Sequence, residues 1–155
     1  MRLNFAGAPE IRTTRAEVWR HLLDPHFIAA CLPAVRSVEV LAPTRFRVIS
    51  GFGAGFVRLD FTVVIELYDL VEPEHARLRM SGTAPGTSVE MQSQIAIEEA
   101  GAGRVRLRWT AESVVEGTIA AVGRRLMEEA ARRLTEMFWR EFARRTEALH
   151  VQAGR

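Results

Sequence analysis

The spacing of apolar residues along the chain changes once, shortly after residue 115. From about residue 38 to residue 115, apolar and polar side chains alternate, and after that point apolar residues recur with the helical period of about 3.6 residues. Successive side chains of a strand point to opposite faces, whereas the helical period gathers side chains on one side of a helix. We therefore expect a sheet followed by one long terminal helix.

The alternation is clearest in the middle of the chain. One face of a single strand would carry six apolar side chains, namely Val57, Leu59, Phe61, Val63, Ile65 and Leu67. Short turn sequences separate the strands: residues 51–55, Glu72-Pro73-Glu74, Pro85-Gly86 and Gly101-Ala102-Gly103. Strands joined by such short turns predict an antiparallel meander with one face in water.

The N-terminal part is expected to add one strand and two short helices. Residues 3–11 alternate loosely and predict the strand. Thr14 can cap a helix, and Glu17 three residues later would complete a capping box. This helix should end at Asp24-Pro25, because the residue before a proline disfavours the helical conformation. The second helix is expected over residues 27–30.

The terminal helix is predicted to be amphipathic. Its apolar stripe would contain Ile119, Val122, Gly123, Leu126, Met127, Ala130, Leu134, Met137, Phe138 and Phe142. Glutamates followed four residues later by arginines, such as Glu128 and Arg132, cover the other faces. Such a helix would be roughly 45 Å long and is too charged to span a membrane. We expect one domain over residues 1–150 and a short C-terminal tail over residues 151–155.

These elements together predict an α+β helix-grip fold. A seven-stranded antiparallel sheet would wrap around the long C-terminal helix, with two short helices after the first strand. A curved sheet and a straight helix touch at one end and diverge at the other, so an apolar cavity can remain between them. The ligand-binding residues of its lining are predicted to be Phe46, Val48, Phe52, Leu59, Phe61, Met80, Met91, Ser93, Trp109, Ala111, Leu126, Met127, Ala130 and Leu134. Gly51, Gly53 and Gly55 would form a hairpin at the cavity mouth.

The same side chains could instead pack together as an ordinary filled core. Two features favour a cavity. Gly82, Ala111 and Ala130 would leave space on its walls, and the flexible side chains of Met80 and Met91 adapt to irregular shapes.

No constellation for catalysis or metal binding is apparent. The histidines are His21, His26, His75 and His150, and none has a metal-ligand spacing with Cys31. The glycines at 51–55 join two strands and lack the following helix on which phosphate loops depend. Only serines accompany the apolar residues of the inner face, and serine alone cannot abstract a proton. We expect no catalytic residue and no metal site. His21 and His26 are expected to have surface or capping roles, and Cys31 is expected to be a buried structural thiol.

The charge pattern argues against a nucleic-acid surface. All 21 basic residues are arginine, the net charge is only +2, and arginines and glutamates are interspersed. No apolar run approaches the roughly 18 residues of a membrane span, and residues 1–10 lack the apolar core of a signal peptide. A single cysteine excludes an intrachain disulfide. We expect a cytoplasmic protein.

Several segments resemble one known family. Ala30-Cys31-Leu32-Pro33 precedes alternating valines, and the glycines at 51–55 precede Val57-Arg58. Residues 117–126 and then 130–134 would open the terminal helix. In this order and spacing, from Phe5 to about Phe142, the chain is similar to the CoxG family of carbon monoxide dehydrogenase subunits.

The resemblance implies a START-like fold of the SRPBCC superfamily. It also implies a non-catalytic accessory protein of a molybdenum carbon monoxide dehydrogenase or a related hydroxylase, linked to recruitment of that enzyme to the membrane. Family members are associated with a quinone, menaquinone or ubiquinone, carried in the cavity with no covalent cofactor. Relatives often continue past the terminal helix with a tail that could reach a membrane, whereas this sequence ends at Arg155. We expect any membrane contact to be peripheral, at the inner face.

Two other functions stay open at this point. A ligand-free factor that recruits or matures the molybdenum enzyme would have a filled interior. A polyketide cyclase-like enzyme of the same fold would need a carboxylate or a histidine facing the cavity.

Overall fold

The computed structural model describes residues 1–154. Its strands are β1 (Arg2–Gly7), β2 (Glu10–Ile11), β3 (Val35–Ala42), β4 (Arg45–Ala54), β5 (Val57–Val71), β6 (His75–Ala84), β7 (Thr87–Glu99) and β8 (Val105–Gly117). Its helices are α1 (Arg15–Leu22), α2 (Pro25–Ala30), the 3₁₀ helix η1 (Thr118–Val122) and α3 (Arg124–Ala153). This element order confirms the predicted α+β helix-grip arrangement.

The strands form one antiparallel sheet. Their order is β1-β8-β7-β6-β5-β4-β3, and the two-residue β2 also pairs with β8. The predicted first strand is interrupted at Ala8-Pro9, where the proline has no N–H to donate to the ladder. Because both pieces pair with β8, they occupy the place of one strand. The predicted seven-stranded sheet is confirmed, with its first strand in two parts.

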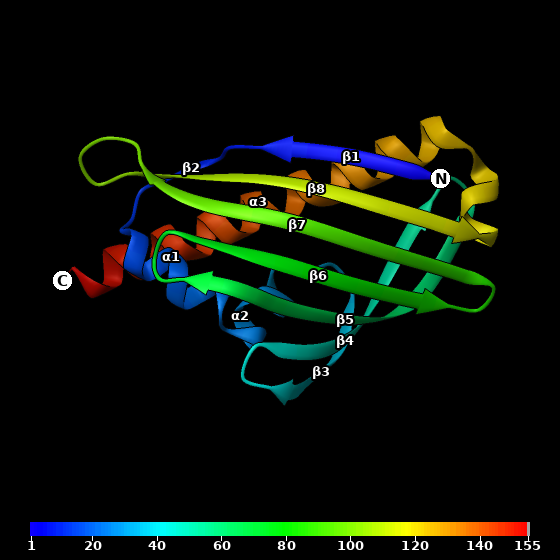
Figure 1. Cartoon of the computed structure of the whole chain (residues 1–155), viewed down its shortest axis with the longest axis horizontal. Helices are drawn as coiled ribbons and strands as arrows, with labels where there is room; N and C mark the ends of the chain where they lie inside the picture. Colours follow the sequence, from blue (N-terminus) through cyan, green and yellow to red (C-terminus); the bar gives the residue numbers. More distant parts are fainter. Residues whose placement is uncertain (155) are drawn as a thin grey trace.

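The sheet curls around α3, which crosses its concave face diagonally (Figure 1). The short helices α1 and α2 lie toward the C-terminal end of α3, and η1 lies at the other end (Figure 1). Burial alternates along the strands as predicted, for example at Val105, Leu107, Trp109, Ala111, Ser113 and Val115 of β8. The inner face of the sheet is thus the apolar one, and it faces α3.

Buried apolar residues form two groups on this inner face. The first group joins α1, α2 and the C-terminal half of α3 to the sheet and includes Trp19, Ile28 and Phe142. The second lies beneath η1 and the start of α3 and includes Ile119 and Met127. The interior therefore has two separately packed ends.

The terminal helix starts later than its apolar stripe predicts. Gly123 has a φ of 97°, a conformation that residues with a side chain rarely adopt, and it separates η1 from α3. Ile119 and Val122 consequently belong to η1, and within α3 the stripe begins at Leu126. Leu126 and Met137 are 41% and 42% exposed, so their predicted positions on the core face are wrong.

At its other end α3 continues to Ala153, into the segment expected as a tail. Arg155, the last residue of that segment, lies outside the described residues. No helix within residues 1–154 is both long and apolar enough to cross a bilayer.

Polar contacts hold the C-terminal half of α3 against the N-terminal part of the chain. They join Thr146 to His21 (3.0 Å), His150 to Glu17 (2.9 Å) and Glu147 to the backbone N–H of Arg12 (3.1 Å). One of these contacts changes the predicted capping box. Thr14 accepts the N–H of Glu17 at 3.2 Å as expected, but the Glu17 carboxylate binds Thr13 and His150 instead of returning to the cap.

Candidate functional site

An apolar cavity of about 160 Å³ lies between the sheet and the N-terminal half of α3. Strands β1 and β4 to β8 form one wall, and Met127, Ala131, Leu134 and Thr135 of α3 form the other. The segment between α2 and β3 closes one side. Residues from both buried groups reach the lining, so the cavity occupies the space where the two packed ends meet.

Small and flexible side chains line this space. A methyl group added at Gly82 would meet its neighbours only at 3.6 Å or more, so glycine leaves room there. Ala111 of β8 and Ala131 of α3 contribute little volume to opposite walls. Met80 and Met91 stand opposite each other on neighbouring strands, and their side chains can change shape to fit a guest.

The structure places half of the predicted lining residues around the cavity: Phe52, Phe61, Met80, Met91, Ala111, Met127 and Leu134. Phe46 and Val48 instead lie fully within the first buried group. Trp109 stacks on Trp139 of α3, with 6.0 Å between the ring centroids. All of these residues come from the predicted inner face. Whether a residue lines the cavity or packs in the core depends on how closely α3 approaches the sheet at that point.

The remaining predicted residues, Leu59, Ser93, Leu126 and Ala130, also do not line the cavity. Ser93 donates its hydroxyl to the carbonyl oxygen of Thr110 at 2.7 Å. Leu59 lies in a groove outside the cavity mouth. Ala130 packs against the second buried group, while its neighbour Ala131 faces the cavity.

Sequence reasoning missed the part of the wall that comes from the N-terminal region. Leu3 and Phe5 of β1 face the cavity because β1 pairs with β8 along the sheet edge. Their spacing of two residues was a usable signal for a shared face. Leu32 and Pro33, which follow α2, also line the cavity, and no local pattern marked them.

Three hydroxyl groups are the polar side chains of the lining. Ser50 donates to the carbonyl oxygen of Pro33 at 2.7 Å, and Thr135 donates to the carbonyl oxygen of Arg132 at 2.9 Å. Ser113 has no hydrogen-bond partner within residues 1–154, and its oxygen is not sealed off from the cavity. Ser113 is therefore the hydroxyl that is available to a guest.

The cavity opens into a groove between the β4–β5 hairpin and α3. Pro33, Gly51, Phe52 and Leu134 belong to both the cavity and the groove. The predicted glycine turn is wrong in extent, because the ladder between β4 and β5 continues to the pair Ala54 and Val57. The turn consists of Gly55 and Phe56 alone, and Gly55 has the positive φ of 58° that such two-residue turns require. Gly51 and Gly53 lie within β4.

The buried histidine and cysteine sit outside the cavity. His21 was predicted to have a surface or capping role, but it is buried and stacks on Phe27 at 4.1 Å between ring centroids. The reason is its hydrogen bond to Thr146, which the sequence does not reveal. Cys31 is buried as predicted, with its thiol 3.3 Å from the carbonyl oxygen of Phe27, and burial raises its pKa to about 11.

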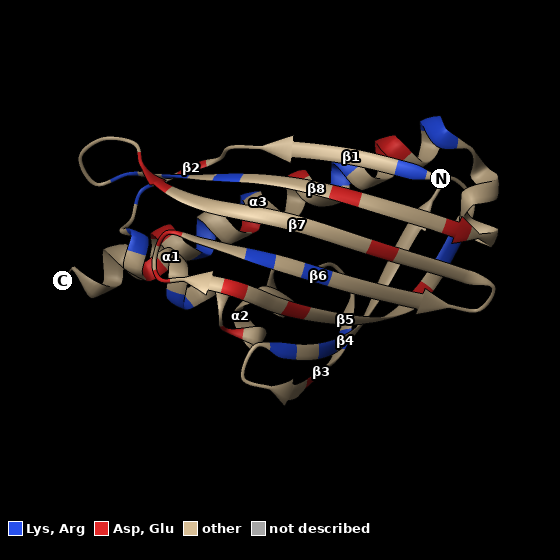
Figure 2. Ribbon diagram, in the orientation of Figure 1, with Lys and Arg blue, Asp and Glu red and all other residues tan. Residues whose placement is uncertain are grey.

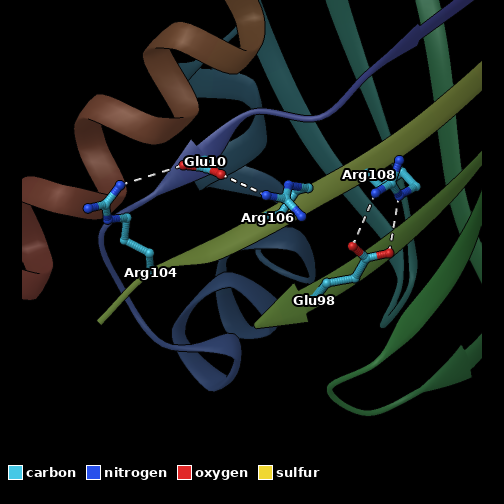
Figure 3. Close-up of polar contacts among 5 residues, drawn as sticks. All are labelled: Glu10, Glu98, Arg104, Arg106 and Arg108. Atoms are coloured by element: carbon cyan, nitrogen blue, oxygen red, sulfur yellow. Dashed lines mark hydrogen bonds and ion pairs between the residues drawn. The ribbon is translucent and has the colours of Figure 1, made fainter. Parts of the chain in front are cut away.

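Charged side chains of the outer sheet face form cross-strand ion pairs. Arg106 lies 2.8 Å from Glu10, and Arg108 lies 3.1 Å from Glu98 (Figure 3). Arg79 likewise pairs with Glu66 at 3.3 Å. Figure 2 shows these opposite charges on neighbouring strands.

Comparisons of the whole chain support the fold. It is similar to a conserved protein from Geobacillus kaustophilus, with 25% identity and a TM-score of 0.88 over 96% of this chain and 97% of that one. A START superfamily protein from Mycobacterium smegmatis matches with 12% identity and a TM-score of 0.72, covering 94% and 98% of the two chains. The Zhui aromatase/cyclase from Streptomyces sp. R1128 matches with 17% identity and a TM-score of 0.71, covering 95% and 94%.

These solved structures confirm the START-like fold, and a sequence comparison is more specific. No curated protein is similar enough to match the chain. Residues 7–146 match the family model of CoxG, a subunit of carbon monoxide dehydrogenase. This match spans nearly all of the elements that build the sheet, the cavity and α3. The chain therefore belongs to the CoxG family of carbon monoxide dehydrogenase subunits.

Proposed function

We propose that the protein holds an apolar ligand, a quinone or a lipid, in the cavity beneath α3 and acts as a non-catalytic accessory of a molybdenum carbon monoxide dehydrogenase-type enzyme. The observation that carries the proposal is the cavity itself. Protein interiors normally pack as densely as organic crystals. A cavity of about 160 Å³ with apolar walls is therefore unusual, and its walls favour an apolar guest.

The size of the cavity limits what can enter it. An engineered apolar cavity of about 150 Å³ stays dry and binds benzene. The cavity described here thus accommodates one ring or a short chain, and the remainder of a larger ligand would extend into the groove at the mouth. The ring of a quinone matches this limit, and the Ser113 hydroxyl can donate a hydrogen bond to a quinone carbonyl.

The partner and the location follow from family membership and one surface feature. The family name supports association with a carbon monoxide dehydrogenase. Phe56, at the tip of the β4–β5 hairpin, is 88% exposed. An aromatic ring at a loop tip is suited to insertion at a membrane surface. We infer peripheral contact with the inner face of the membrane, where ligand and electrons would be handed over.

Two alternatives have specific observations against them. The aromatase/cyclase among the similar structures raises the possibility of catalysis. However, the cavity lining within residues 1–154 has hydroxyls but no histidine or carboxylate to act as a base. A ligand-free recruitment factor would have no need of an apolar cavity.

Calorimetric titration with two ring-only quinones tests the proposal. The probes are 2,3-dimethoxy-5-methyl-1,4-benzoquinone and 2-methyl-1,4-naphthoquinone. Saturable binding is expected for at least one of them. Ala131→Phe should abolish it, because the new ring would occupy the cavity from the helix side.

The matched control is Ala148→Phe, which makes the same change at an exposed position of α3. Overpacking can cost about 1–3 kcal/mol, so Ala111→Val on the opposite wall serves as a second filling variant. Failure of both quinones to bind, with no apolar adduct in native mass spectra of the purified protein, would exclude a quinone as the ligand.

A further inference from the structure

The groove outside the cavity mouth has a different chemical character from the cavity. Its volume is about 490 Å³, and it runs between β3, β4 and β5 on one side and α3 on the other. Leu59 and Met137 give it an apolar floor close to the mouth. Its charged side chains are Arg36, Arg58, Asp60 and Arg133. An amphiphile whose apolar end filled the cavity would therefore place its head group among guanidinium groups.

The three arginines of the groove are not equally engaged. Arg36 lies 3.1 Å from Asp60, and Arg133 lies 3.3 Å from Glu129 on the preceding turn of α3. The Arg133 and Glu129 side chains are 74% and 54% exposed, so this pair is weak in water. No carboxylate oxygen of residues 1–154 lies within 4.0 Å of the Arg58 guanidinium. The groove thus retains positive charge, and Arg58 is its available donor.

Glycines in β4 give Arg58 access to the groove. Gly53 is the partner of Arg58 in the ladder, and the Arg58 side chain lies across it: a methyl group at Gly53 would be 3.1 Å from the Arg58 Cγ. A side chain at Gly53 would therefore displace the arginine. Because Gly53 has no side chain, the Arg58 guanidinium can lie beside the β4 backbone at the cavity mouth.

The backbone of β4 adds a second donor at the same place. The N–H of Gly51 points away from β5 and donates to the carbonyl oxygen of Ala34 at 3.2 Å. Along an antiparallel strand this direction recurs at every second residue. Gly53 lies beyond the last residue of β4 that pairs with β3, so its N–H points to the open edge of the sheet. A guanidinium and an N–H pointing into one groove suit an oxyanion.

Most arginines of the sheet, unlike Arg58, have a carboxylate partner. Arg79, Arg106 and Arg108 each have a carboxylate on a neighbouring strand (Figures 2 and 3). Arg45, at the start of β4, also has no carboxylate within 4.0 Å among the described residues, but it lies outside the groove. Arg45 therefore provides a matched control for the charge of Arg58.

We propose that the groove binds the acidic head group of a single-chain amphiphile, a carboxylate or a phosphate, whose apolar chain enters the cavity. This inference rests on the proposed function, because the cavity must accept the apolar part. It adds a selection rule: among apolar ligands of equal length, the protein prefers those with an anionic head. Arg58 and the N–H of Gly53 contact the anion, and Arg36 and Arg133 add positive charge around it.

Calorimetric titration of octanoate and octan-1-ol tests the selection rule, since the two probes share a chain length and differ in charge. The wild-type protein should bind octanoate at least about tenfold more tightly, which corresponds to about 1.4 kcal/mol. Arg58→Gln should remove this preference and leave the affinity for octan-1-ol unchanged. Arg45→Gln should preserve the preference.

The outcomes separate the two proposals. Equal affinity of the wild-type protein for octanoate and octan-1-ol would overturn the acidic-head inference and leave the carrier function standing. Loss of preference in Arg45→Gln as well as in Arg58→Gln would overturn it too, because net charge alone would then explain the effect. Failure of both probes and of both quinones would reject the carrier function itself.

A bilayer is the other source of an anionic head group, and vesicles distinguish it. Vesicles of phosphatidylglycerol and of phosphatidylcholine are each sedimented with the wild-type protein and with Arg58→Gln. With octanoate at a saturating concentration, the proposal expects the wild-type protein and Arg58→Gln to sediment with the vesicles to the same extent. Loss of vesicle binding in Arg58→Gln under that condition, with no effect on octanoate affinity, would assign the groove to a membrane surface and overturn the proposal.

Discussion

The buried imidazole of His21 lies 3.0 Å from the hydroxyl of Thr146, although 125 residues separate them in the chain. This hydrogen bond joins α1 to the C-terminal part of α3, next to the aromatic rings of Phe27 and Phe142. The pair therefore connects the first helix of the chain to the last.

Thr146→Val should destabilise the protein by about 1–3 kcal/mol, because valine keeps the shape of threonine but leaves the buried Nδ1 of His21 without a partner. Chemical denaturation gives the free energy of unfolding. Thr83→Val, the same change at an exposed position of β6, should alter it little. Equal effects of the two variants would show that the hydrogen bond contributes nothing.

His21 should also make stability depend on pH. Burial, reinforced by the positive charge of Arg20 and opposed by Glu17 and Asp24, lowers the pKa of His21 below its ordinary value of 6.5. The unfolded chain then binds a proton more readily than the folded one. Stability is accordingly full above pH 6.5 and falls as the pH decreases through 6.5.

His21→Gln should flatten this slope below pH 6.5, whatever it does to the absolute stability. Denaturation midpoints measured across a pH series provide the test. His26→Gln, at an exposed position of α2, should keep the slope of the wild-type protein. An unchanged slope in His21→Gln would contradict the assignment.

Glu17 should contribute in a separate and more acidic window. Burial disfavours its charge, but hydrogen bonds from Thr13 and His150 outweigh that effect and lower the pKa of Glu17 below 4.5. Its contribution is present above pH 4.5 and is lost as the pH falls through the folded-state pKa. Glu17→Gln should therefore reduce the loss of stability below pH 4.5, as followed by denaturation midpoints in the same pH series.

Cys31 should be unreactive in the folded protein. Burial raises its pKa to about 11, and the thiolate is the reactive form. N-Ethylmaleimide at mildly alkaline pH should modify the thiol only after denaturation, as followed by mass spectrometry. Rapid modification of the native protein would show that α2 opens readily.

Phe56→Ser should weaken sedimentation with phosphatidylglycerol vesicles, because an 88% exposed ring can be lost without disturbing the core. The thermal midpoint should be unaffected. Val151→Ser, at an exposed position near the end of α3, controls for the loss of surface apolar area. Identical vesicle binding by the wild-type protein and Phe56→Ser would remove the hairpin tip from the membrane-contact proposal.

The fold was predictable because its signals are local. The alternation of Val57 to Leu67, the two-residue turn at Pro85-Gly86 and the capping threonine at Thr14 each depend on neighbouring residues alone. The position of the terminal helix was less predictable: α3 starts only after Gly123, and Ala131, not Ala130, faces the cavity.

The cavity walls were only partly predictable for a related reason. Phe46 and Met80 share the inner face, yet one is packed in the core and the other lines the cavity. Whether space remains beside a residue of the inner face depends on the distance there between the sheet and the axis of α3. That distance is set by contacts across the whole chain, such as the one between His21 and Thr146, which leave no local pattern.

Three side-chain hydrogen bonds join the second half of α3 to the N-terminal part of the chain, whereas the first half, which covers the cavity, has one, from Arg124 to the carbonyl oxygen of Arg2. One continuous helix is thus expected to contain two regions of different local stability. Amides of residues 124–137 should exchange with deuterium faster than those of residues 142–150. On the carrier proposal, the first half would open by fraying at the Gly123 break while the second half keeps the fold intact, and a ligand would exchange without global unfolding.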